Sequence, residues 1–303
     1  MTIRTKMSAA DIATAAAVLR DHPDYRVLRR LPRPYEDLPD ELPEGARRIA
    51  ILDLETTGLD PDTDAIVELA LMHVAVDAAG KVLGHSRTMA WREDPRRPLS
   101  PEITALTGLT DADLAGQSLD EKAIMTVLSR CSLVVAHNCG FDIRFVDKRL
   151  PEAAGLPWAC SCEEVPWTKL GLPCRKLGHL LVEHGAFFAG HRAEADVWAT
   201  FQLLQQQVIA HEGATLNVPA DTSYFQLLLA SSDGGVVRLR AYGLPFDQKD
   251  WAKTRGYRWD ALKRVWWADV PIDDYLAEKA AFAEAGLPEP AGTALNAYQR
   301  YRH

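Results

Sequence analysis

The sequence predicts an α/β protein, with a mixed β-sheet flanked by helices and a small α+β module at its C-terminal end. Three observations predict this class. Three strand-like apolar segments come first, helical segments then alternate with one further apolar strand, and a Trp-rich segment follows a polar linker at residues 217–223. Strands followed by helices that alternate with a strand are typical of a sheet with helices on its faces.

The first 46 residues are expected to form an arm that leads into the main domain. Residues 9–20 have the pattern of a short, Ala-rich helix, and a basic stretch at 25–34 precedes an acidic, Pro-rich stretch at 35–45. Such charged, Pro-rich segments favour loops. The basic stretch has two interpretations, contact with nucleic acid or packing on the domain.

The main domain is expected to span residues 47–216 and to begin with three antiparallel strands. Apolar runs at 48–54, 66–76 and 85–91 have strand-like composition, and the sequence DAAG at 77–80 is a hairpin signal. The rest of the domain should be mainly helical, with one strand at 133–138. Helices are expected at 101–106, 118–130, 141–150, 176–185 and 192–213.

A small Trp-rich basic module is expected at residues 217–287. Alternation predicts a strand at 236–242, and a hairpin at 257–270 should lie between helices at 247–256 and 272–286. The remaining tail, residues 288–303, is expected to be frayed.

Bulk composition excludes several classes of protein. No apolar run of the 303-residue chain is long enough to span a membrane, and the N-terminus lacks a signal-peptide pattern, so a cytoplasmic location is expected. Five cysteines, an odd number, argue against a disulfide framework. Cys160, Cys162 and Cys174 lack a completing half-site for zinc, so reduced thiols are expected. The net charge of −8 gives no global attraction to nucleic acid, although a local basic surface is not excluded.

Two acids end the first strand of the main domain. Asp53 and Glu55 are two residues apart, so in a strand both side chains point to the same face. Two neighbouring carboxylates repel unless they are exposed, protonated or bridged by a cation.

Further polar residues follow other expected elements. Asp142 opens a helix after the strand at 133–138, and His191 and Asp196 stand at the start of the long helix. Five helical positions differ by about 140°, so His191 should lie at the mouth of that helix rather than within it. Four carboxylates and one histidine are the groups needed for two divalent cations, Mg²⁺ or Mn²⁺, and a general base, which indicates phosphodiester hydrolysis.

Three motifs in this order resemble those of the DEDD superfamily of 3′-to-5′ exonucleases, in its DnaQ-like branch typified by the proofreading epsilon subunit of bacterial replicative polymerases. They are DLETTG at 53–58, HNCGFD at 137–142 and HRAEAD at 191–196, whose spacing is that of the histidine-containing (DEDDh) subtype. The segment at 99–114 is similar to the family's linking segment. The resemblance covers residues 47–212 and implies a ribonuclease H-like sheet.

The resemblance also implies roles for individual residues. One metal ion would be bound by Asp53, Glu55 and Asp196. Asp53 would bridge to a second ion, which Asp142 would hold largely through water, and His191 would be the general base. The terminal sugar would lie near Thr56, Thr57 and Gly58, and the terminal nucleotide near Asn138 and Phe141. The segment WACSCEE at 158–164 replaces an Asp-Thr pair found in many relatives, at a position that is not one of the five catalytic ones.

Plainer interpretations apply to other residues. Acids near the first motif are expected to be turn and surface charges: Asp60, Asp62, Asp64 and Glu68. In the module, aromatic residues stand beside cations, which is the combination that binds single-stranded nucleic acid. A small domain also needs tryptophans to fill its hydrophobic core. The sequence therefore allows the tryptophans to be core residues, nucleic-acid contacts or both. The candidate nucleic-acid contacts there are Lys249, Lys253, Arg255, Arg258, Lys263 and Arg264.

The sequence therefore predicts a metal-dependent 3′-to-5′ exonuclease that releases nucleoside 5′-monophosphates from single-stranded or frayed DNA 3′ ends. An exoribonuclease of the same superfamily is the alternative with the same chemistry, and a catalytically silent nucleic-acid-binding or scaffold protein is the alternative from another class. A DNA polymerase or repair partner cannot be read from the sequence, although a separate module favours DNA repair outside the replisome.

Overall fold

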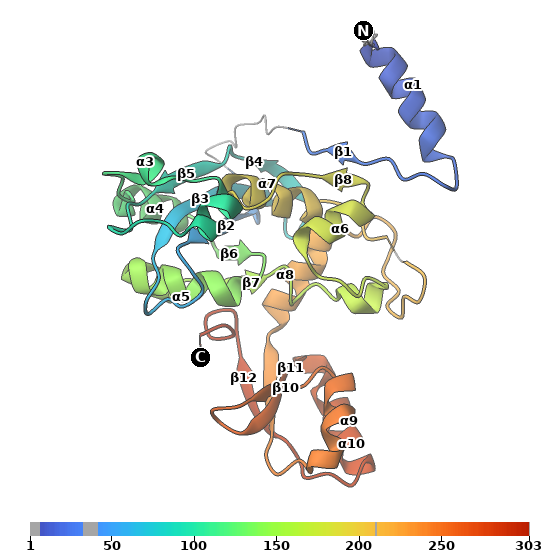
Figure 1. Cartoon of the computed structure of the whole chain (residues 1–303). Coiled ribbons are helices and arrows are strands. Elements are labelled where there is room, and N and C mark those ends of the chain that lie inside the picture. The colour runs from blue at the N-terminus through green and yellow to red at the C-terminus, as the bar shows by residue number, and fades with distance from the viewer. Residues whose placement is uncertain (1–6, 33–41, 210, 303) are drawn as a thin grey trace.

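The computed structural model describes residues 7–32, 42–209 and 211–302. Its main sheet has the strand order β4-β3-β2-β6-β7, with β5 also paired to β3 (Figure 1). Strand β2 is antiparallel to β3 and parallel to β6, so the sheet is mixed, as predicted. The bounds are β2 (Arg47–Thr56), β3 (Ile66–Val76), β4 (Val82–His85), β5 (Met89–Arg92), β6 (Leu133–Ala136) and β7 (Trp158–Cys160).

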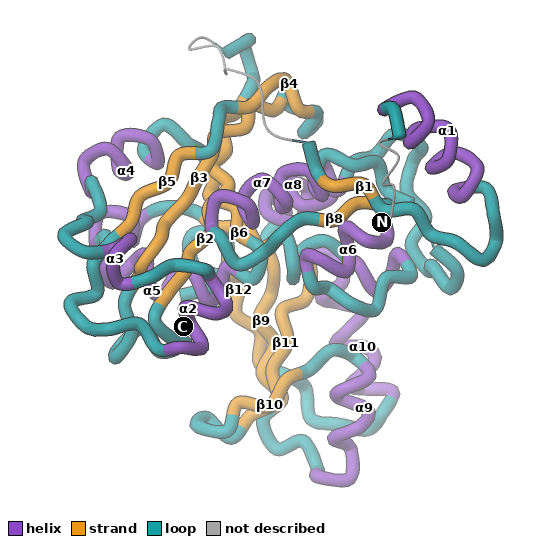
Figure 2. Tube along the Cα trace, turned by 45° about the horizontal axis from the view of Figure 1, so that its top comes forward, coloured by secondary structure: helices purple, strands orange, loops and turns teal. Residues whose placement is uncertain are grey.

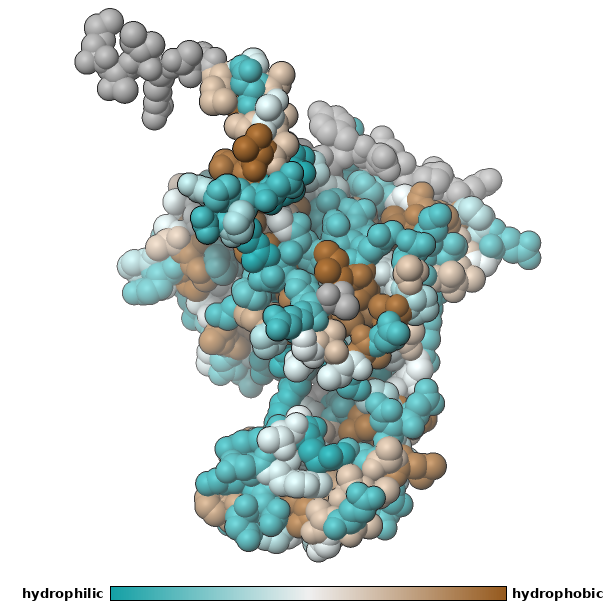
Figure 3. All heavy atoms as spheres, turned by 90° about the vertical axis from the view of Figure 1, so that its right-hand side faces the viewer, coloured by the Kyte–Doolittle hydropathy of each residue, from teal (hydrophilic) through white to brown (hydrophobic). Residues whose placement is uncertain are grey.

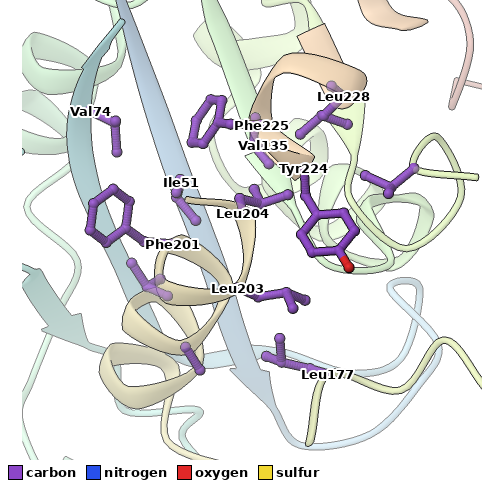
Figure 4. Close-up of a cluster of buried hydrophobic side chains, with 14 of the residues drawn as sticks. Ile51, Val74, Val135, Leu177, Phe201, Leu203, Leu204, Tyr224, Phe225 and Leu228 are labelled. Carbon is purple, nitrogen blue, oxygen red and sulfur yellow. The ribbon is translucent and has the colours of Figure 1, made fainter. Parts of the chain in front are cut away.

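Helices cover both faces of this sheet. The helices of this part of the chain are α2 (Pro101–Thr107), α3 (Asp111–Leu114), α4 (Glu121–Leu128), α5 (Cys139–Arg149), α6 (Leu177–Glu183), α7 (Ala193–Leu204) and α8 (Tyr224–Gly234). Helices α7 and α8 lie on one face of the sheet, and α4 and α5 lie on the other. Because side chains alternate along a strand, Ile51 joins a core with α7 and α8, whereas Leu52 joins a second core with α4 and α5. Figure 4 shows the first core, where Ile51, Phe201 and Leu204 lie together. Two apolar layers therefore sandwich the central strands.

Two expected elements of the main domain differ from the structure. The strand expected at 85–91 is divided into β4 and β5, because Ser86 closes the ladder with both backbone and side-chain hydrogen bonds to His73. The helix expected at 192–213 ends at Leu204. Beyond it, Val208 donates a backbone hydrogen bond to Thr222, so this segment pairs with the polar linker instead of continuing the helix. Helix α8 was not predicted.

The N-terminal arm carries the expected helix, α1 (Ala9–Arg20), which Ser8 caps with a capping box. Figure 1 shows α1 projecting away from the sheet, and none of its residues is buried. The basic stretch that follows packs on the domain, since β1 (Arg29–Arg30) pairs with β8 (Ala186–Phe187) and Arg26 pairs with Glu183. Most of the acidic stretch, residues 35–41, and residues 33–34 of the basic stretch lie outside the described residues.

The C-terminal module is a four-stranded antiparallel sheet with the order β10-β11-β9-β12. Figure 2 shows helices α9 and α10 on one side of these strands. The module is α+β, as predicted, and the expected hairpin is β10 and β11. The bounds are β9 (Val236–Ala241), α9 (Lys249–Thr254), β10 (Arg258–Asp260), β11 (Val265–Pro271), α10 (Tyr275–Glu284) and β12 (Ala291–Leu295), with 3₁₀ turns at Phe246–Gln248 and Ile272–Asp274. Two further 3₁₀ turns, Pro151–Gly155 and Trp167–Leu170, belong to the main domain.

The tail was expected to be frayed, and this prediction is wrong. Strand β12 completes the module's sheet beside β9. The chain then returns to the main domain, where the backbone N–H of Trp158 donates to the carbonyl of Ala297 at 2.8 Å. Arg302 binds Asp147 at 2.7 Å, and the C-terminal end lies beside α5 (Figure 1). A tail with few apolar residues is held by polar contacts, which composition alone does not reveal.

None of the helices in the described ranges is long and apolar enough to cross a bilayer.

Candidate metal-dependent active site

Three carboxylates meet at the end of β2. Asp53 and Glu55 lie on the same face of this strand, as its alternation predicts, and Asp196 approaches them from the first turn of α7. One carboxylate oxygen from each of the three acids lies within 4.8 Å of the others. The described residues therefore contain one site in which oxygen ligands for a divalent cation already converge.

Asp196 is held by the start of its own helix. Its carboxylate oxygen accepts a hydrogen bond from the backbone N–H of Arg192 at 3.2 Å, and His191 has a left-handed backbone with φ of 65°. His191 thus lies two residues before α7, at the helix mouth where the sequence placed it, and it is exposed. An exposed imidazole beside a carboxylate cluster can reach a water molecule or a substrate.

Asp142 is the fourth acid. It lies in the first turn of α5, which follows the left-handed residue Asn138, and its side chain is buried. The start of a helix favours a negative charge through the helix dipole. Asp142 raises the pKa of both Asp53 and Glu55, so it acts on the same site.

The carboxylates strongly perturb one another. Burial and the neighbouring charge of Asp142 raise the pKa of Asp53 well above its usual range. Burial and the charge of Asp196 raise the pKa of Glu55 to about 8, and burial raises the pKa of Asp142 to about 8. Burial also raises the pKa of Asp196. Four acids that disfavour one another's charge are a donor set that divalent cations fit, because the cations remove the repulsion.

Glu68 was expected to be a surface charge, and this prediction is wrong. It is 1% exposed, and on the neighbouring strand β3 it is paired directly with Glu55 of β2. Its carboxylate accepts hydrogen bonds from the Arg192 guanidinium at 2.8 and 3.1 Å and from the backbone N–H of Ala193 at 3.1 Å, and Arg92 lies at 3.2 Å. Burial alone would raise the pKa of Glu68, but the two arginines lower it below its usual value. Glu68 therefore fixes the N-terminus of α7, which carries Asp196.

A signal for Glu68 was present in the sequence. It is the single charged residue in IVELALMHVAV, a segment in which every residue of β3 is buried. A carboxylate inside such a strand needs a partner of opposite charge.

The loop after Glu55 is organised by Asp64, another acid that was expected to be a turn or surface charge. Its carboxylate accepts hydrogen bonds from Thr57 at 3.1 Å and from Arg97 at 2.8 Å. A Cβ on Gly58 would lie 2.4 Å from this carboxylate, so the glycine permits a close approach within the loop itself. Thr56 donates to the carbonyl of Gly58 at 2.5 Å, which tightens the same turn.

The two residues expected near a terminal nucleotide differ in exposure. Asn138 is exposed, and it lines a cleft between the main domain and the C-terminal module. Phe141 is half-buried, with its ring 4.9 Å from that of Phe145.

The unusual segment at 158–164 is where the tail docks. Glu164 is buried against Arg300, and its carboxylate accepts hydrogen bonds from the Tyr301 hydroxyl and the Cys160 backbone N–H, each at 2.8 Å. All five cysteines are unpaired, and in the described part of the chain none joins a metal-ligand cluster.

The aromatic residues of the module have divided roles. Tyr257 belongs to the hydrophobic core of the module, and Trp251 and Trp266 pack against this core. Trp259 is half exposed. Five of the six candidate cations lie against a partner. Lys253 lies near Asp250, Arg255 pairs with Glu278, Arg258 with Glu163 and Lys263 with Asp260, Lys249 lies over the Phe246 ring at 4.2 Å, and Arg264 is exposed.

Comparisons with known proteins match the part of the chain that carries these residues. A family model described as "Exonuclease" matches residues 50–204, which include the four acids and His191. A DNA polymerase III PolC-type protein of Thermotoga maritima is 31% identical over 124 residues, covering 40% of this chain and 9% of that protein. Ribonuclease T of Shewanella baltica is 31% identical over 114 residues, covering 33% of this chain and 51% of that enzyme.

The chain spans about a tenth of the PolC-type relative and about half of the ribonuclease T relative. Among solved structures, Escherichia coli exonuclease I in complex with an oligonucleotide superposes with a TM-score of 0.43 and 20% identity, covering 52% of this chain and 40% of that one.

Proposed function

Because the chain belongs to the exonuclease family, whose model spans residues 50–204, we propose that it is a metal-dependent 3′-to-5′ exonuclease. Membership confirms the resemblance read from the three motifs. The proposed substrate is a single-stranded or frayed DNA 3′ end, from which nucleoside 5′-monophosphates are released. The exonuclease domain is proposed to span residues 47–216, and α8, which follows it in the chain, packs onto the same core.

The observation that carries the proposal is the convergence of Asp53, Glu55 and Asp196 within 4.8 Å. These acids, with Asp142, are the residues that would hold Mg²⁺ or Mn²⁺. Two such ions would stabilise the charge that develops on the attacking and leaving oxygens.

The chain's own groups have separate tasks in this proposal. The His191 imidazole, exposed at the mouth of α7, accepts the proton of the attacking water. Glu68 and Arg192 hold the backbone that carries His191 and Asp196 in place. The backbone of Thr56, Thr57 and Gly58 and the side chains of Asn138 and Phe141 border the terminal nucleotide.

The match to a DNA polymerase III PolC-type protein supports the choice of DNA over RNA, and the match to ribonuclease T supports the alternative of an exoribonuclease. The proposed protein partner is a DNA polymerase or a repair protein. The unpaired thiols fit a reducing compartment, so the proposed location is cytoplasmic.

The proposal is tested with 3′-extended single-stranded DNA and an RNA of matched sequence, each with Mg²⁺ or Mn²⁺. Wild-type protein should shorten at least one of them from the 3′ end and release mononucleotides, and the two rates decide between the substrates. Asp53→Asn and Asp196→Asn should lower the rate by at least about a hundredfold, because each removes a ligand charge.

A silent binding or scaffold protein is the remaining alternative. No release of mononucleotides from either strand, or release by both variants at the wild-type rate, would favour it and overturn the proposal. Arg130→Gln, which removes an exposed charge after α4, is the control and should cleave like wild type.

A further inference from the structure

A cleft of about 640 Å³ lies between the main domain and the C-terminal module. Both parts contribute to its walls, among them Asn138, Arg144 and Arg175 from the main domain and Arg258 and Trp267 from the module. Figure 3 shows the narrow waist that joins the upper and lower lobes of the molecule. The four acids and His191 are not among the residues that line the cleft, but Asn138 and Gly140 of its wall lie at the start of α5, the helix that carries Asp142.

The cleft is locally basic in a chain of net charge −8. Six arginine or lysine side chains line it, against three acids. Two of those acids are already committed to buried arginines, Asp269 to Arg238 and Glu164 to Arg300. Glu163 is the acid that faces the exposed cations.

Glu163 joins the two lobes by binding an arginine from each. A single carboxylate oxygen, Oε2, lies 3.1 Å from Arg175 of the main domain and also contacts Arg258 of the module. Both guanidinium groups are solvent-accessible, at 43% and 53% exposure, so these ion pairs contribute little and can exchange. An oxygen anion held between two arginines is also how a phosphate is bound.

An aromatic ring completes this arrangement. The guanidinium of Arg258 lies 5.4 Å from the centre of the Trp267 ring, and that of the buried Arg238 lies 4.7 Å from it. Cations that follow a groove together with an aromatic side chain are the features with which proteins hold single strands without sequence preference.

We propose that this cleft holds the phosphodiester backbone of a single strand whose 3′ end lies at the carboxylates, and that Glu163 occupies a phosphate position until the strand displaces it. The inference rests on the proposed exonuclease function. It differs from a nucleic-acid contact spread over the module, because it assigns binding to the wall that faces the main domain.

The test measures binding separately from cleavage. Fluorescein-labelled oligo(dT) and oligo(U) are titrated with the full chain in EDTA, which prevents cleavage, at several salt concentrations. Arg175→Gln and Arg258→Gln should each weaken binding about tenfold, the loss expected for one charge-assisted hydrogen bond. Glu163→Gln should instead tighten binding, because the competing anion is removed.

Salt dependence and substrate length give independent measurements. The double variant should lower the slope of log affinity against log salt by about 1.4, since each single-strand phosphate contact contributes about 0.7. With Mg²⁺, the ratio of kcat/KM on a long strand to that on a dinucleotide should fall about tenfold in either arginine variant. The control Arg130→Gln should bind and cleave like wild type.

The outcomes separate the two proposals. Wild type that binds both strands but cleaves neither contradicts the exonuclease function and leaves the binding measurements as the test of the cleft. Arginine variants that bind as tightly as Arg130→Gln, or a Glu163→Gln variant that binds more weakly than wild type, overturn the cleft proposal. Equal losses on oligo(dT) and oligo(U) assign the contact to the shared backbone, whereas a loss confined to one strand overturns a backbone contact. Glu163→Gln keeps the test decisive if an arginine variant does not fold.

Discussion

At the scale of single residues, Glu68 determines where the acids of α7 lie. It is the buried group that ties β3 to the backbone of Ala193 and to the guanidinium of Arg192. Removing one partner from a buried, charged hydrogen-bond network leaves the other unsatisfied, which is costly.

Glu68→Gln should therefore act on Asp196 without touching substrate. The amide keeps the shape but loses the charge, so the start of α7 should loosen and the free energy of unfolding should fall by about 1–3 kcal/mol. Because Asp196 would be displaced from the metal site, we expect kcat to fall at least about tenfold. The concentration of Mg²⁺ or Mn²⁺ that gives half the maximal rate should rise.

Metal titrations of the rate check this expectation. A variant that is less stable but has an unchanged metal dependence would reduce Glu68 to a structural role. Arg92→Gln is the control, because it removes a partner of Glu68 on β5 and leaves the hydrogen bonds from Arg192 and Ala193 to Glu68 in place.

The sequence was sufficient to identify those site residues whose positions follow from the regular repeat of a single strand or helix. Asp53 and Glu55 could be assigned to one face because a strand alternates strictly, and His191 to a helix mouth because of its spacing from Asp196. The role of Glu68 was not predicted, because it depends on the neighbouring strand β2 and on Arg192, which is more than a hundred residues away in the sequence. Its buried neighbours were the available signal.

At the scale of elements, the loop from β2 to β3 is a compact unit built around Asp64. Thr57, Arg97 and the backbone N–H of Asp60 all bind its carboxylate. Gly58 packs directly against it, so the loop has no room for a larger residue at this position.

Gly58→Ala should disturb this element. The new methyl group would lie 2.4 Å from the Asp64 carboxylate, which must move and release Thr57 and Arg97. Because overpacking destabilises a folded protein, Gly58→Ala should lower the free energy of unfolding by roughly 1–3 kcal/mol. Urea denaturation measures this change. Activity should fall as well, because the loop follows Glu55 directly.

Gly178→Ala in helix α6 is the matched control. A Cβ added at Gly178 would have no neighbouring atom within 4 Å, and alanine favours a helix by up to about 1 kcal/mol, so this variant should be as stable as wild type or more stable. Equal stability of the two variants would contradict the tight packing around Gly58.

The elements whose ends were predicted wrongly are terminated by contacts with residues distant in the sequence. Helix α7 stops at Leu204 because the following segment pairs with the linker, as the bridge between Gln207 and Ser223 shows. An apolar pattern that continues to residue 209 carries no information about such pairing. Most helices and strands were predictable, because their periodicity or their turn residues are local.

At the scale of the whole molecule, the tail connects the two lobes in addition to the Glu163 ion pairs. It leaves the module's sheet at β12 and inserts Arg300 beside Glu164, where both side chains are nearly inaccessible. Arg302 adds an ion pair with Asp147 of α5. The tail therefore supports the cleft, because it fixes the module against the main domain.

Deleting residues 296–303 should uncouple the two lobes. Glu164 would lose Arg300 and Tyr301, and a buried carboxylate without its partner costs about 3–5 kcal/mol. Since burial already raises the pKa of Glu164, the deleted chain should relieve this cost by protonation, and its stability deficit should shrink as the pH falls. Calorimetry should resolve two transitions where the full chain shows one. Glu164→Gln in the deleted chain should recover part of the loss, whereas an unchanged single transition would show that the tail is dispensable.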